Sequence, residues 1–120
     1  MLLNPLEFGD YIMKIDVSFY GTVYNSAKYI RRSLKSLIVT SLELKRRYNI
    51  SSEIIIVDNY SIDGTWEIML ELKRLYDKDV KLKLVRYRSS RGLGRMIALH
   101  LAAGEYLFFI DLDLEYSPHT

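Results

Sequence analysis

Three carboxylates at alternate positions near the end of the sequence offer its clearest chemistry. Asp111, Asp113 and Glu115 follow the apolar run 106–110 in the stretch GEYLFFIDLDLEYSP. Side chains two apart in an extended segment point the same way, about 6.6 Å apart, so these groups repel one another. A divalent cation with oxygen ligands, Mg²⁺ or Mn²⁺, would remove that repulsion. A solvated strand end or a backbone cap is the structural alternative.

Other chemistries fit the sequence less well. A calcium EF-hand loop is excluded because Tyr116 stands where that loop needs glycine. The stretch GLGRMI (92–97) lacks the third glycine of a dinucleotide fingerprint and does not follow the first predicted strand. The absence of cysteine excludes disulfides, thiolate zinc sites and cysteine nucleophiles. Of the two histidines, we expect His100 to be a packing or surface residue, and His119 has no predicted place.

Alternating strands and helices must position the carboxylates. Runs rich in β-branched and aromatic residues predict strands, and apolar residues at helical spacing predict helices. The predicted strands are 14–21, 53–58, 80–87 and 105–111, and the helices are 26–48, 63–76 and 95–103. The second strand should be buried on both faces, and the apolar content of the last suggests full burial as well. The segment 88–94 is expected to be a loop.

The βαβαβαβ order predicts an α/β fold in three layers: a mostly parallel sheet with helices on both faces. The expected strand order is 3-2-1-4, which makes the first and last strands neighbours. The loops TVYN, DNYSIDGT and DLDLE would then meet at the carboxyl ends of the strands, where ligands bind in such sheets. We divide the chain into an N-terminal extension, 1–13, and a domain, 14–120.

Composition narrows the class of protein. The 120 residues suffice for one domain or part of one, and 49% are hydrophobic, enough for a core. A net charge of +2 is too small to argue for nucleic acid as a partner. No apolar run approaches the roughly 20 residues of a membrane span, and the N-terminus lacks the features of a signal peptide. We therefore expect a cytoplasmic location. Segments outside this chain could still bring the protein to the inner face of a membrane.

Several motifs in order resemble one family. VSFYGTVYNSAKYIRRSLKSL is similar to its first strand, Tyr-Asn turn and first helix, and EIIIVDNYSIDGT resembles its Val-Asp-Asp-Gly-Ser-x-Asp-Gly-Thr pattern. RGLGRMIALHLAAGEYLFFIDLDLEYSP resembles its glycine-basic loop, Gly-Glu-Tyr strand entry and Asp-x-Asp motif. Over residues 14–118 the chain thus resembles the N-terminal, nucleotide-binding half of family 2 glycosyltransferases, which have the GT-A fold. Each motif alone is weak, but their order and spacing are specific.

The resemblance implies a nucleoside-diphosphate sugar as donor, with Mg²⁺ or Mn²⁺ at the diphosphate. It also implies roles for individual residues. Asp113 would touch the metal directly, and Asp111 would act on the ribose or through water; Asp63 would be a turn and cap residue. The remaining nucleotide contacts would be Thr22 and Tyr24 at the base, Asp58 and Asn59 at the base and ribose, and Arg91 and Arg95 near the diphosphate.

The chain departs from the family pattern in three ways. Asn59 replaces the second aspartate, Tyr60 replaces the glycine, and the segment from the glycine loop to GEY is shorter than in many members. The family's acceptor site and general base lie C-terminal to the Asp-x-Asp motif. We therefore expect the general base beyond Thr120, and the chain to be part of a longer protein.

Three functions follow, in order of preference. The first is the donor-binding region of a metal-dependent, inverting glycosyltransferase whose acceptor, a glycan, lipid or protein, is unknown. The second is a nucleotide or nucleotide-sugar binding module without catalysis. The third is a sugar nucleotidyltransferase, which is disfavoured because its glycine-rich loop would follow the first strand, where this chain has GTVYNS.

Overall fold

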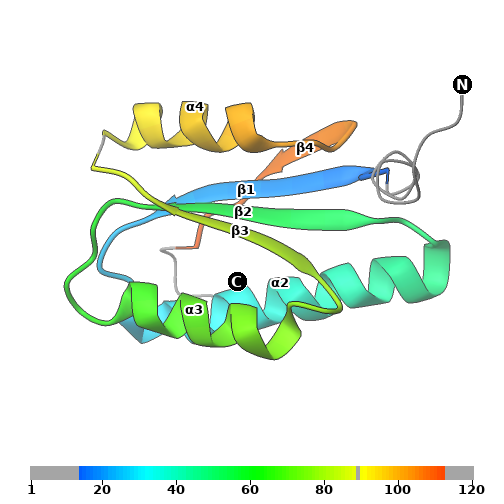
Figure 1. Cartoon of the computed structure of the whole chain (residues 1–120), viewed down its shortest axis with the longest axis horizontal. Helices are drawn as coiled ribbons and strands as arrows, with labels where there is room; N and C mark the ends of the chain where they lie inside the picture. The colour runs from blue at the N-terminus through cyan, green and yellow to red at the C-terminus, as the bar shows by residue number, and fades with distance from the viewer. Residues whose placement is uncertain (1–13, 89, 113–120) are drawn as a thin grey trace, which may run out of the picture.

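A computed structural model describes residues 14–88 and 90–112, without the side chain of Arg91. The elements are β1 (Val17–Val23), α2 (Ala27–Tyr48), β2 (Ser52–Asp58), α3 (Thr65–Tyr76), β3 (Lys81–Arg86), α4 (Arg91–Leu101) and β4 (Tyr106–Phe109). All strand pairs are parallel, in the order β3-β2-β1-β4, which confirms the predicted sheet (Figure 1). The proposed extension 1–13 lies outside the described residues, so it stays a prediction.

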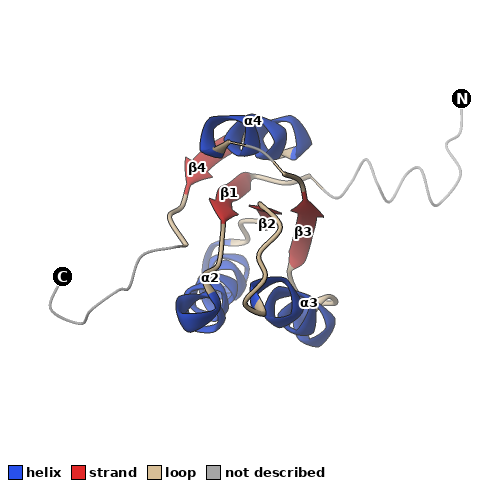
Figure 2. Cartoon of the chain, turned by 90° about the vertical axis from the view of Figure 1, so that its left-hand side faces the viewer, coloured by secondary structure: helices blue, strands red, loops and turns tan. Residues whose placement is uncertain are grey.

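Helices cover both faces of the sheet, as predicted. Figure 2 shows α2 and α3 on one face and α4 on the other. The alternation of strand and helix leads to this arrangement because each parallel connection must cross a sheet face. No helix within the described residues is long and apolar enough to span a membrane.

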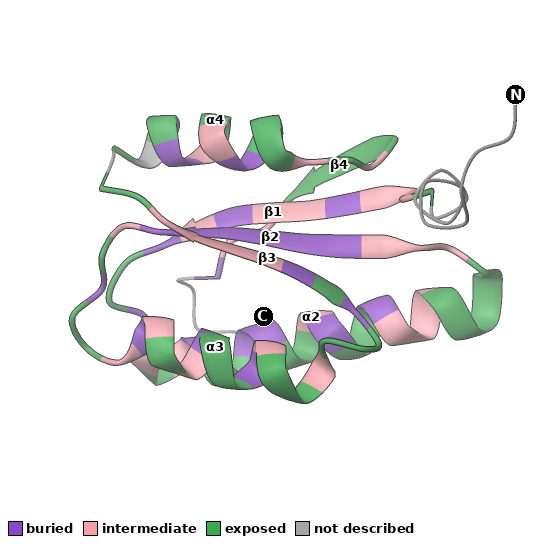
Figure 3. Cartoon of the chain, in the orientation of Figure 1, coloured by how far each residue is buried: buried purple, intermediate pink, exposed green. Residues whose placement is uncertain are grey.

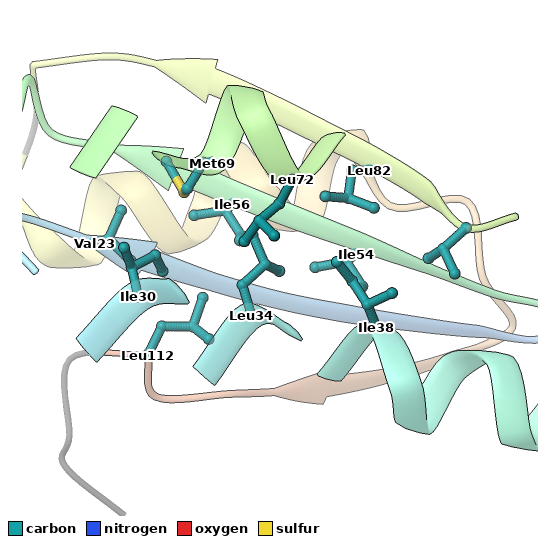
Figure 4. Close-up of a cluster of buried hydrophobic side chains, with 11 residues drawn as sticks. Val23, Ile30, Leu34, Ile38, Ile54, Ile56, Met69, Leu72, Leu82 and Leu112 are labelled. Atoms are coloured by element: carbon teal, nitrogen blue, oxygen red, sulfur yellow. The ribbon is translucent and has the colours of Figure 1, made fainter. Parts of the chain in front are cut away.

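The main core lies between the sheet and the pair α2 and α3. One stripe of α2 supplies Ile30, Leu34 and Ile38, which are fully buried against Ile54 and Ile56 of β2 (Figure 4). Met69 and Leu72 of α3 and Leu82 of β3 complete this layer. Strand β2 is buried on both faces, as its run of β-branched residues predicts, because Ile55 and Val57 pack on the opposite side with Ala98 of α4 (Figure 3).

The last strand differs from the prediction. All four residues of β4 are exposed, from 43% at Phe109 to 60% at Tyr106, so the expectation of full burial is wrong for the described residues. The physical reason is position: among the described strands, β4 pairs only with β1 and lies at an edge of the sheet. Apolar content indicates a strand here, but it does not determine what covers that strand.

Most element boundaries differ from the prediction by one or two residues, and the largest differences are at β1 and α4. Helix α4 begins at Arg91 rather than Arg95, because Ser90 caps it by accepting a hydrogen bond from the backbone of Leu93 at 3.2 Å. The predicted loop 88–94 is therefore partly the first turn of a helix. Strand β1 runs from Val17 to Val23, since its carboxyl end pairs with β2 as far as Asp58.

Candidate functional site

Two loops at the carboxyl edge of the sheet are bonded directly to each other: the first loop, 24–26, follows β1, and the second loop, 59–64, follows β2. The backbone N–H of Asn25, after β1, donates to Ser61 Oγ at 2.8 Å, and Asn25 Oδ1 accepts from the backbone of Ile62 at 2.9 Å. Asn25 has φ 47° and Tyr60, in the second loop, has φ 54°. Each loop therefore contains a non-glycine residue whose backbone adopts the left-handed conformation. The two loops therefore form one rigid unit rather than two independent turns.

The start of α2 is bonded to side chains of the second loop and of the first residue of α3, and the side chain of its own N-cap residue makes no capping bond. Ser26 is the N-cap residue, yet its backbone N–H donates to Thr65 Oγ1 at 2.8 Å. The next N–H, of Ala27, donates to Asp63 Oδ2 at 3.0 Å. Burial works against ionisation of Asp63, but bonds from Thr65 and from the backbone of Ala27 outweigh it and lower its pKa. The predicted structural role of Asp63 is thus confirmed, with the cap serving α2 as well as the turn.

The carboxylate of Asp58 lies at the carboxyl end of β2 and is fully buried. Its Oδ1 accepts from Ser61 Oγ at 2.5 Å and from Ser61 N at 3.2 Å. Its Oδ2 lies 3.4 Å from Arg86 Nε. Both oxygens are therefore engaged inside the protein, and Asp58 shapes the loop that follows it.

Arg86 is a site residue that the sequence analysis missed. Its guanidinium lies near two aromatic rings, 4.7 Å from the centroid of Tyr60 and 5.2 Å from that of Trp66. It also donates to the carbonyl of Ser61 at 2.8 Å. Since Arg86 is the register partner of Asp58 on the neighbouring strand, a basic residue at the end of the third predicted strand was the available signal.

The other predicted base contacts lie around this unit. Thr22 is a half-buried residue near the end of β1, and Tyr24, 53% exposed, lies in the loop after it. The backbone of Asn59 donates to the carbonyl of Val23 at 3.0 Å, which joins the start of the second loop to the end of β1. The structure thus brings Thr22, Tyr24, Asp58 and Asn59 together at one edge.

Asp111 approaches the same edge from β4. The backbone of Ile110 donates to the carbonyl of Tyr20 at 2.9 Å, so the half-buried Asp111 follows the end of β4 beside β1. Gly21 permits this close approach, because a Cβ there would lie 2.6 Å from the carbonyl oxygen of Ile110. The strand order therefore places Asp111 at the carboxyl edge, as predicted.

Both predicted basic residues, Arg91 and Arg95, lie on α4. The Arg95 guanidinium lies 4.2 Å from the ring centroid of Phe109, in β4, which orients it toward the strand that precedes Asp111. Arg91 is the first residue of α4.

Asp113 and Glu115 lie outside the described residues, as does His119. Among the residues the structure describes, no three His, Cys, Asp or Glu side chains gather to form a metal site.

Comparison with known proteins identifies the family. Residues 18–120 match the family described as Glycosyl transferase family 2. The chain belongs to this family. Among curated relatives, the family 2 chain is 34% identical over 97 residues to a poly(ribitol-phosphate) beta-glucosyltransferase of Bacillus spizizenii, covering 81% of this chain and 14% of that protein. It is 32% identical over 98 residues to the glycosyltransferase SunS of Bacillus subtilis, covering 82% of this chain and 20% of that protein.

Solved glycosyltransferase structures share the fold. A fragment of S. aureus TarS superposes with a TM-score of 0.61 at 29% identity, over 82% of this chain and 28% of that one. A mannosyltransferase from Pyrobaculum calidifontis, in complex with GDP-Man and Mn²⁺, gives a TM-score of 0.69 at 26% identity, over 83% of this chain and 28% of that one. These neighbours confirm the GT-A resemblance. The family 2 chain spans well under a third of the length of each of these four proteins.

Proposed function

We propose that the chain is the donor-binding region of a glycosyltransferase that takes a sugar from a nucleoside-diphosphate sugar. The single observation that supports this most is the cross-bonded pair of loops at the carboxyl edge, which gathers Thr22, Tyr24, Asp58 and Asn59 beside the end of β4. In parallel sheets this edge is where nucleotides bind. The acceptor, a glycan, lipid or protein, and the general base are expected on residues outside this chain, and the stereochemistry is proposed to be inverting.

A divalent cation is part of the proposal. Asp111 supplies a half-buried carboxylate oxygen at the strand end, the ligand type that Mg²⁺ and Mn²⁺ prefer. We propose that Asp113 is the direct ligand and that Asp111 acts beside it or on the ribose. When bound, the cation would supply Lewis-acid stabilisation of the charge that develops on the departing nucleoside diphosphate. The mannosyltransferase that superposes on this chain is in complex with GDP-Man and Mn²⁺.

The protein residues would orient and neutralise the donor. Tyr24, exposed in the loop after β1, and Thr22, near the end of β1, would contact the base, and Asn59 would contact the base or ribose. Arg95, on α4, would add positive charge near the diphosphate, with Arg91 at the start of the same helix. We also propose that the protein is located in the cytoplasm, where its nucleotide-sugar donor would be available. Cell fractionation tests this location.

Titration calorimetry with GDP and UDP, in the presence and absence of Mn²⁺, tests the proposal. We expect at least one nucleoside diphosphate to bind more tightly with Mn²⁺, and Asp113→Asn to remove more of that difference than Asp111→Asn. Equal affinity with and without Mn²⁺ would refute the metal role. Absence of binding to any nucleoside diphosphate would refute the donor site itself.

A further inference from the structure

Tyr60 holds a backbone conformation that its side chain disfavours. Its φ of 54° is left-handed, a region that bulky residues rarely adopt. Glycine would adopt this turn without strain, and the sequence pattern that the chain resembles has glycine at this position. A strained residue at a site edge suggests a functional role. The turn itself therefore does not need the tyrosine ring, which makes the ring a candidate for a functional role.

The ring of Tyr60 is in contact with two arginine side chains and is still partly exposed to solvent. The Arg86 guanidinium lies 4.7 Å from its centroid and that of Arg88 5.7 Å, yet Tyr60 remains 43% exposed. Arg86 is itself held by Asp58 and by the carbonyl of Ser61. The exposed aromatic surface is therefore fixed in place before any ligand arrives, which favours base stacking because little side-chain freedom remains to be lost.

Tyr60 also lies at the edge where the nucleotide is proposed to bind. It follows Asn59, whose backbone is bonded to the end of β1, and it precedes Ser61, which is bonded to Asn25. Asp58, by contrast, is fully buried with both oxygens engaged. The ring of Tyr60 is therefore an aromatic surface of this loop that a ligand can reach without displacing the buried Asp58.

We propose that the ring of Tyr60 stacks on the nucleobase of the bound nucleoside diphosphate and strengthens its binding, while Arg86, held by Asp58, supports the ring. This inference rests on the proposed function and deepens it. The opposing interpretation is that the ring only covers Arg86 and stabilises the fold.

Two substitutions and one matched control separate these interpretations. Tyr60→Gly removes the ring and relieves the strain, whereas Tyr60→Phe keeps the ring. Asn49→Gly is the control, because Asn49 has φ 55° at the far end of α2. Calorimetry in Mn²⁺ would compare GDP and UDP with inorganic pyrophosphate, which has no base. We expect Tyr60→Gly to weaken binding of the preferred nucleotide by about fivefold or more, the size of a lost stacking contact.

The same substitution should leave the affinity for pyrophosphate unchanged, because pyrophosphate has no base to stack. It should also reduce the part of a preference for GDP over UDP that comes from stronger stacking of the larger guanine ring. Tyr60→Phe and Asn49→Gly should bind like the wild type. If Tyr60→Gly does not fold, Tyr60→Asn replaces it, since asparagine tolerates left-handed backbone. Unchanged nucleotide affinity in the variant, or equal losses for nucleotide and pyrophosphate, would overturn the inference alone. A wild type that binds no nucleoside diphosphate would overturn the proposed function with it.

Discussion

Strand β2 carries a fully buried carboxylate near each end, and the two differ in what they hold. At the amino end, Glu53 Oε2 accepts from Ser18 Oγ of β1 and from the backbone of Ala103, both at 2.6 Å. Its Oε1 lies 2.8 Å from Lys83 Nζ of β3. Glu53 therefore joins three neighbouring segments: the two strands beside β2 and the connection from α4 to β4.

At the carboxyl end, Asp58 is bonded within its own loop through Ser61, and among the described residues its partner from another strand is Arg86. Glu53 stabilises the sheet, whereas Asp58 shapes a loop that faces outward. The comparison shows that burial of a charged group does not by itself identify a binding site. The location of its partners, within the sheet or within an exposed loop, distinguishes the two roles.

The largest expected effect is on stability at the amino end. Glu53→Ala leaves Lys83, Ser18 and the N–H of Ala103 without their shared acceptor, so the free energy of unfolding should fall by about 3 kcal/mol. Urea unfolding followed by circular dichroism measures this. Glu43→Ala, which removes an exposed partner of two arginines on α2, is the control and should change little. Equal losses in both variants would contradict the structural role of Glu53.

Gly104 offers a second test of packing at the amino end of the sheet. A Cβ at this position would lie 2.5 Å from Ser18 Oγ and 2.6 Å from Ser18 N, so Gly104→Ala should destabilise the protein by about 1–3 kcal/mol. Gly92→Ala is the matched control, because Gly92 lies in α4 with open space around it and alanine there should stabilise by about 0.5–1 kcal/mol. A thermal melt of both variants tests the prediction, and shifts of the same sign would disprove it.

Asp58→Asn should cost less stability than Glu53→Ala but affect binding more. The amide can still accept from Ser61, while the charged partner of Arg86 is lost, so we expect about 1–2 kcal/mol. The loosened loop should also weaken nucleoside-diphosphate binding, which calorimetry measures. Asp77→Asn, at an exposed ion pair with Lys73, should change neither quantity. Unchanged affinity in Asp58→Asn would show that the loop does not depend on this carboxylate.

The smallest expected effect is on the pH dependence of stability. Burial opposes ionisation of Glu53, but bonds from Lys83, Ser18 and the backbone of Ala103 outweigh it, so its pKa lies below the ordinary 4.5. The unfolded chain then binds the proton more tightly, and the stabilisation present above pH 4.5 is lost as the pH falls through the folded-state pKa. Glu53→Gln should flatten the acid limb of a stability–pH curve. An unchanged limb would contradict the lowered pKa.

Much of the fold was predictable, because each element carries its own pattern. The buried run at Ile54–Val57 and the stripe of Ile30, Leu34 and Ile38 determine how strand and helix pack, and parallel connection rules then order the sheet. The exposure of β4 was not predictable, because an apolar sequence indicates a strand but not which strands or helices pack against it. The cap at Ser90 was also hidden, because the glycines after it suggested a loop.

The candidate site was predicted in position more than in contacts. The motif located Asp58 at the end of a strand, but not its burial, which depends on Ser61 and Arg86. Glu53 was missed because a lone carboxylate before an isoleucine run has no motif. Its partners come from segments as distant in sequence as Ser18 and Ala103, and only the folded sheet brings them together.

Hydrogen–deuterium exchange most directly tests the central claim that the carboxyl edge binds the nucleotide. With a nucleoside diphosphate and Mn²⁺ added, we expect slower exchange in the two cross-bonded loops, at the backbone of Asn25 and Ile62. Exchange at Ala103 and Gly104, beside Glu53 at the amino edge, should stay unchanged. Protection at Ala103 and Gly104 without protection at Asn25 and Ile62 would contradict the assignment of the site.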